Sequence, residues 1–105
     1  MSDIKQLLKE AKGELANEEY EDAIALSLQV LELDPENYFA NVFLGKAYSC
    51  ESLLKDLGKA ARSYIAAALS QPQVMLAWKG LFMLLGSHGQ QILPAEIEYL
   101  SLIHI

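Results

Sequence analysis

Two proline-centred segments divide this chain of 105 residues into lengths that suggest a repeat. Asp34-Pro35-Glu36-Asn37 has a weaker counterpart in Gln71-Pro72-Gln73-Val74, and the two prolines are 37 residues apart. Proline cannot continue a helix and restricts the residue before it, so each segment is expected to end one helical hairpin and open the next. An internal period of this size is typical of stacked helical hairpins.

Between these segments the apolar residues recur with the period of a helix and not with that of a strand. Asn37 is placed to cap a helix, and Pro94 suits a first helical turn. The fold class predicted is all-α, an α-solenoid of tandem helix-turn-helix units, about two and a half of them. The pattern predicts helices over residues 3–16, 20–33, 38–50, 55–70 and 74–86, with a further helix beginning at Pro94.

Side chains of the expected type fall at matching places in successive units. They are Tyr20, Ala23, Leu31, Asp34 and Pro35 in the first unit, Leu44, Gly45, Ala47, Tyr48, Ala60, Tyr64, Ala67 and Pro72 in the second, and Trp78 and Leu81 in the third. This pattern resembles the tetratricopeptide repeat, a helix-turn-helix unit of about 34 residues.

The resemblance implies a first repeat over 1–37, a second over 38–74 with a short insertion near 52–56, and a truncated third over 75–99. Small residues such as Gly45 are expected to let helices approach closely, while Tyr64 and Trp78 fill the gaps between hairpins. Glu10 and Phe82 depart from the pattern, at a leucine position and at a small-residue position.

Residues 100–105, Leu-Ser-Leu-Ile-His-Ile, can be back-translated as CTG TCT CTT ATA CAC ATC. That string resembles the end of a transposase-based sequencing adaptor, so we expect 100–105 to be adaptor-derived and the natural chain to continue beyond residue 99. A natural apolar tail is the alternative. If the natural chain does continue, we expect residues 1–99 alone to be marginally stable or to self-associate, because the third repeat then lacks its second helix.

Acidic residues concentrate in the first third of a chain whose net charge is −6. Residues 1–37 hold ten acids against three lysines, which disfavours direct binding to nucleic acid. Cys50 is the sole cysteine, so no intrachain disulfide can form. Together with a start that lacks a signal-peptide layout and with no apolar run long enough for a membrane span, this predicts a reducing cytosolic or nuclear setting and no membrane partner.

No constellation of catalytic residues is found in the sequence. His88 is the sole histidine outside 100–105 and has no identifiable carboxylate or hydroxyl partner. The acids between Glu18 and Asp22 stand at a predicted helix start, where the helix dipole favours negative charge. We therefore predict a non-enzymatic protein with no metal and no cofactor.

A candidate binding face comes from the repeat pattern, because the first helix of each unit lines the concave side of a repeat superhelix. The hypothesis is a groove for an extended or helical partner segment with acidic and apolar side chains; ordinary solubilising lysines are the alternative. The carboxylate clamp of tetratricopeptide co-chaperones is not matched. The predicted face consists of Lys5, Leu8, Lys12, Phe39, Val42, Lys46, Leu76, Lys79 and Met83.

A closer resemblance is carried by residues 1–12, 33–40, 43–47 and 76–82. These stretches resemble the N-terminal end of the tetratricopeptide subunit family of the fungal superkiller complex. The resemblance implies a scaffold that organises helicase and propeller-type subunits, in a complex that feeds messenger RNA to the cytoplasmic exosome for 3′-to-5′ decay. This arm would then contact regulatory partners or an exosome adaptor. A generic interaction module and the regulatory arm of an enzyme with a catalytic domain beyond residue 99 are the alternatives.

Overall fold

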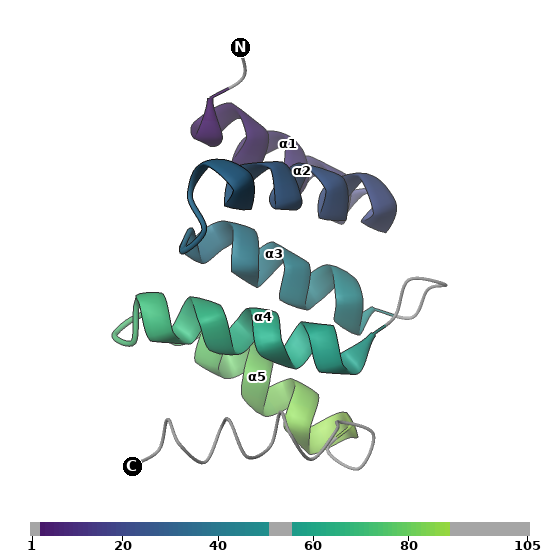
Figure 1. Ribbon diagram of the computed structural model, residues 1–105. Helices are drawn as coiled ribbons and strands as arrows, with labels where there is room; N and C mark the ends of the chain where they lie inside the picture. The colour runs from purple at the N-terminus through teal and green to yellow at the C-terminus, as the bar shows by residue number, and fades with distance from the viewer. Residues whose placement is uncertain (1–2, 51–55, 89–105) are drawn as a thin grey trace.

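The computed structural model describes residues 3–50 and 56–88, and within them it has five helices and no strand (Figure 1). The all-α prediction is confirmed, and each predicted helix agrees with the structure to within two residues at both ends. Most of the predicted insertion, the helix expected at Pro94 and the tail 100–105 lie outside the described residues. The helices are α1 (Ile4–Ala16), α2 (Tyr20–Leu33), α3 (Tyr38–Ser49), α4 (Leu57–Ser70) and α5 (Met75–His88).

The helices stack in chain order, with α1 and α2 at one end and α5 at the other (Figure 1). Helix α1 packs on α2 and α3 packs on α4, which gives two hairpins, and α5 packs on α4 as the start of a third. Helix α3 also contacts both α1 and α5. The three odd-numbered helices therefore form one continuous surface, here named the odd-helix face, as expected for tetratricopeptide-like repeats.

Polar side chains begin three of the helices in the same way. In each, the side chain before the helix accepts a hydrogen bond from the backbone N–H of the third helical residue, which would otherwise lack a partner. The prediction that Asn37 caps a helix is thereby confirmed. The pairs are Asp3 with Gln6 at 2.8 Å, Asn37 with Ala40 at 2.9 Å, and Asp56 with Lys59 at 3.0 Å.

Helix α5 begins differently, because Val74 precedes it and has no polar side chain. The N–H of Ala77, its third residue, donates instead to the Tyr38 hydroxyl at 2.9 Å. Tyr38 lies at the start of α3 and is 3% exposed. A side chain from the second repeat thus performs, inside the core, the task that the preceding residue performs for α1, α3 and α4.

The α1–α2 turn contains a backbone conformation that favours glycine. Glu18 has a φ of 60°, and its N–H donates to the carbonyl of Leu15 at 3.1 Å. The N–H of Glu19 donates to the carbonyl of Glu14 at 2.8 Å. This pair of bonds is the Schellman arrangement, in which the left-handed position is usually glycine.

Tyr64 lies on α4, belongs to the main core cluster and is 5% exposed. A methyl group added at Gly45 on α3 would lie 2.8 Å from the tyrosine ring, and one added at Gly80 on α5 would lie closer still. The ring is therefore held between the backbones of two odd-numbered helices. The prediction that Gly45 lets helices approach closely is confirmed.

Ser27 occupies the corresponding place in α2, 37 residues before Tyr64. Its side chain is fully buried, and its hydroxyl has no hydrogen-bond partner. The contact between the first two helices is accordingly built from smaller groups, with Ala11 also fully buried.

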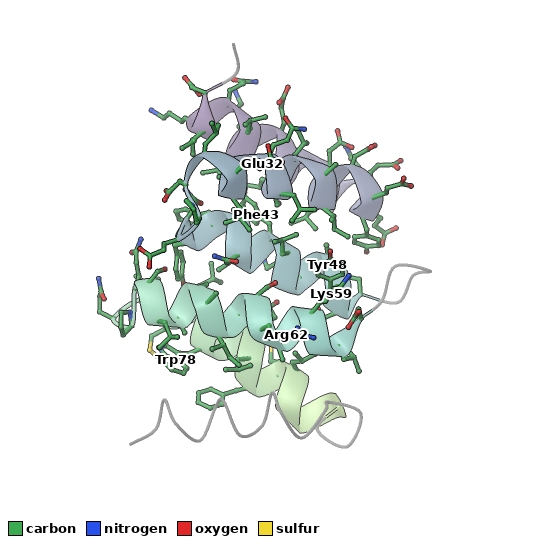
Figure 2. The ribbon with its side chains drawn as sticks, in the orientation of Figure 1. Glu32, Phe43, Tyr48, Lys59, Arg62 and Trp78 are labelled. Atoms are coloured by element: carbon green, nitrogen blue, oxygen red, sulfur yellow. The ribbon has the colours of Figure 1, made fainter. Side chains whose placement is uncertain are left out.

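Trp78 is half-buried and packs on the edge of the core. The indole N–H of Trp78, which is labelled in Figure 2, donates to the carbonyl of Pro72 at 2.9 Å. This bond ties α5 to the turn before it. The ring stacks on Phe82 with the centroids 6.5 Å apart. Phe82, the departure from the repeat pattern, is 54% exposed and so fits without crowding the core.

Candidate functional site

A groove of about 470 Å³ lies between α3 and α5, on the odd-helix face, and Tyr64 of α4 also lines it. We call it the α3–α5 groove. It is lined by Lys46 and Ser49 from α3, Tyr64 from α4, and Leu76, Lys79, Gly80, Met83 and Leu84 from α5.

Helical spacing places the α5 residues together. Leu76, Lys79, Gly80 and Met83 are separated by three and four positions, so they share one side of the helix. Gly80 has no side chain, and its backbone lies against the Tyr64 ring. The absence of a side chain at this position therefore makes room for the Tyr64 ring, which lines the groove.

The chemistry of the α3–α5 groove is mixed. Lys46 and Lys79 are exposed, and Leu76 and Met83 are 41% and 73% exposed. Burial raises the pKa of Tyr64 to about 12, although a hydrogen bond with Ser49 opposes this, so the phenol stays protonated at neutral pH. Cationic groups beside exposed apolar side chains suit binding of an acidic and apolar ligand, whereas acid–base catalysis would need a group that titrates near pH 7.

The structure brings together four of the nine residues predicted to form a binding face. Lys46, Leu76, Lys79 and Met83 all line the α3–α5 groove. The repeat pattern alone was sufficient to select these four residues, because all of them lie on first helices of the repeats. That they bind a partner stays a prediction.

The other five predicted residues lie elsewhere. Lys5 and Lys12 are exposed on α1, outside the groove. Phe39 is 50% exposed and packs its ring edge-on against Tyr38, with the centroids 5.4 Å apart. Leu8 is half-buried against the core.

Val42 was placed on the binding face wrongly, because its side chain is fully buried. Helix α3 is contacted by α1, α2, α4 and α5, so little of its surface remains exposed. Only Phe39 and Lys46 of this helix are exposed. A repeat position whose side chain is exposed on an end helix is therefore buried on the central helix α3.

Sequence reasoning did not assign Ser49, Tyr64, Gly80 and Leu84 to the groove. Gly80 carried a signal, since glycine inside a predicted helix often marks a close approach of another backbone or side chain. Tyr64 had been identified as a packing residue, and it does pack, but one part of it also lines the groove. No sequence signal distinguished Ser49 or Leu84.

A second hollow, of about 310 Å³, lies between α1 and α2 and includes Glu10, Glu14 and Asp22 in its lining. Glu21 and Asp22 stand in the first turn of α2, as predicted from the helix dipole, whereas Glu18 and Glu19 precede the helix. Across residues 3–50 and 56–88, no group of three or more His, Cys, Asp or Glu side chains is arranged to hold a metal ion. None of the described helices has the length and apolar character needed to span a bilayer.

Cys50 follows α3 and is half-buried. A hydrogen bond with Cys50 raises the pKa of Tyr20. This contact connects the start of α2 with the end of α3, across the first and second repeats.

Comparison with known proteins gives a consistent set of relatives. No family model matches the chain. Superkiller protein 3 of Saccharomyces cerevisiae is 49% identical over an alignment that covers 94% of this chain and 7% of the relative. Superkiller protein 3 of Schizosaccharomyces pombe is 41% identical over 80 residues, 76% of this chain and 6% of that relative. Tetratricopeptide repeat protein 37 of Xenopus laevis is 34% identical over 79 residues, 75% of this chain and 5% of that relative. The chain thus spans only a small part of the length of these proteins.

Proposed function

This chain is homologous to a segment of Superkiller protein 3, and from that premise we propose that it is a non-catalytic interaction arm of a superkiller-complex subunit. The observation that carries the proposal is the 49% identity to the Saccharomyces cerevisiae protein over 94% of the chain. The stacked repeats agree with it, because such an array offers an extended surface for protein partners.

In the proposed role, this segment is the N-terminal arm of a cytoplasmic scaffold. The whole scaffold would hold helicase and propeller-type subunits, and the complex would deliver messenger RNA to the exosome for 3′-to-5′ decay. The unwinding of RNA would belong to the helicase. The odd-helix face supports a part for the arm in contacts with those subunits or with an exosome adaptor.

The charge distribution supports an arm that binds protein and not RNA. Exposed acids surround the α1–α2 hairpin, among them Glu18, Glu19 and Glu21. A phosphate backbone would be repelled by this hairpin. The RNA substrate of the proposed complex would therefore be held by other subunits.

Affinity purification of the full gene product that contains this sequence tests the proposal. We expect a helicase and a propeller-type protein to co-purify, and deletion of residues 3–88 to remove at most the partner that the arm itself binds. A catalytic domain in the same polypeptide would instead favour the regulatory arm of an enzyme. Recovery of an assembly without a helicase would favour a generic interaction module.

A further inference from the structure

We propose that the α3–α5 groove binds a short acidic and apolar segment of a protein partner, with Lys46 and Lys79 receiving a carboxylate and Leu76 and Met83 covering an apolar side chain. The inference rests on the proposed interaction function and gives it a site and a ligand chemistry.

Charge complementarity is the first argument. The eight described lining residues of the groove include two lysines and no carboxylate. The chain as a whole has a net charge of −6, so this is a local reversal of sign. Opposed potentials at an interface guide encounter and exclude partners of the wrong charge. A basic segment would be rejected here, and an acidic one attracted.

The apolar part of the lining is the second argument. Met83 is 73% exposed and Leu76 is 41% exposed, while Leu84 below them is 4% exposed. Covering exposed apolar surface stabilises a complex, and methionine adapts its shape to different side chains. A volume of about 470 Å³ holds a few residues of an extended chain or one turn of a helix, so the ligand is a short motif.

Buried contacts beneath the α3–α5 groove fix its shape. The Tyr38–Ala77 hydrogen bond fixes the start of α5 against α3, and Tyr64 fills the space between Gly45 and Gly80. The two lysines therefore project from helices whose separation is set by buried contacts. A site that is formed before the ligand arrives avoids the cost of ordering on binding.

Synthetic peptides test the inference with the whole 105-residue chain. The probe is a fluorescein-labelled six-residue peptide that alternates aspartate and leucine. Its controls are the same peptide with asparagine or with lysine in place of aspartate. By fluorescence anisotropy we expect saturable binding of the acidic probe, binding of the asparagine peptide that is weaker by about tenfold or more, and no binding of the lysine peptide.

Matched substitutions locate the site. Lys46→Glu and Lys79→Glu are each expected to weaken binding of the acidic probe about fivefold or more. Lys59→Glu is expected to leave that binding unchanged. Lys59 is an exposed lysine of α4 that does not line the groove and lies over the Tyr48 ring (Figure 2). Leu76→Asp should abolish binding, while Leu69→Asp, at a leucine of α4 that is 46% exposed, should not. Circular dichroism is the check that each variant folds. Lys46→Gln and Lys79→Gln are milder replacements, for use if a glutamate variant does not fold.

Three results would overturn the inference: no saturable binding of the acidic probe at concentrations up to about 1 mM, equal binding of the asparagine peptide, or equal losses in the groove and control variants. These results do not depend on the superkiller assignment. If peptide binding is found but no helicase co-purifies with the full gene product, the assignment fails and the groove remains. If a helicase co-purifies but no peptide binding is found, the proposed groove site fails and the superkiller assignment remains.

Discussion

The hydroxyl of Tyr38 accepts a hydrogen bond from the backbone N–H of Ala77, 39 residues further along the chain, at 2.9 Å. It supplies the partner that a helix normally finds in the side chain just before it. The start of α5 is thus satisfied by α3, and the second and third repeats share a buried polar contact as well as an apolar one. Both groups lie in the core, so neither has water as a substitute partner.

Tyr38→Phe should reveal the energy of this contact. The change keeps the ring but leaves a buried N–H without a partner, so we expect a loss of about 1–3 kcal/mol in the free energy of unfolding. Tyr48→Phe, also on α3, is the control and should cost less than about 0.5 kcal/mol. Hydrogen exchange at the Ala77 amide gives a local readout; unchanged protection in Tyr38→Phe would contradict the assignment.

Two glycines in helices are expected to respond to alanine with opposite signs. At Gly80 the added methyl group meets the Tyr64 ring, which cannot retreat because Gly45 closes the other side, so we expect a loss of about 1–3 kcal/mol. At Gly13 nothing lies within 4 Å of the added group, and alanine should gain about 0.5–1 kcal/mol through its helix propensity. Thermal melts of both variants compare them directly. A gain at Gly80 would show that the ring is not confined.

Stability should fall in strong base because of Tyr64. Its pKa is about 12 in the folded chain, against an ordinary value of 10.0. Below pH 10 the phenol is protonated in both states, and its contribution is complete. Between pH 10 and pH 12 the unfolded chain loses this proton first, which lowers the free energy of unfolding by roughly 2–3 kcal/mol.

Comparison of denaturant midpoints at pH 9 and pH 11.5 for the parent chain and for Tyr64→Phe measures this effect. The variant should lose less stability than the parent across that interval, since its ring cannot ionise. Parallel curves for the two proteins would mean that Tyr64 ionises as readily folded as unfolded.

Glu18→Gly should stabilise the chain by about 0.5–1 kcal/mol. Glu18 has a φ of 60°, a conformation that costs residues with a β-carbon about 1–2 kcal/mol and glycine little, although glycine also gains freedom in the unfolded chain. Glu18→Ala keeps the β-carbon and should gain nothing from the backbone, which makes it the matched control. A thermal midpoint that rises equally in both would point to removal of negative charge as the cause.

The helix boundaries could be predicted because their signals are local. Pro35 and Pro72 interrupt the helical pattern, and Asn37 caps α3 through a bond to a residue three positions away. The α1–α2 turn was also placed correctly, but its left-handed residue could not be foreseen, because a glutamate stands where glycine is usual.

What the sequence did not show depends on contacts between distant residues. The repeat pattern treats Val42 and Lys79 as equivalent, yet one is buried and the other exposed, because α3 has neighbours on every side and α5 has fewer among the described residues. The role of Gly80 in the groove likewise depends on Tyr64, a residue of another helix. Period and spacing identify which residues share a helix face; the packing of neighbouring helices decides which of them remain accessible.

The two partners of the Tyr38–Ala77 hydrogen bond are synthesised in a fixed order, the acceptor before the donor. A ribosome releases the chain from its N-terminus, so the hydroxyl that accepts this bond has been synthesised and can be buried in the α3–α4 hairpin before Ala77 exists. Helix α5 can then dock on a hairpin that already holds its cap. This docking contact needs no residue that has yet to be made.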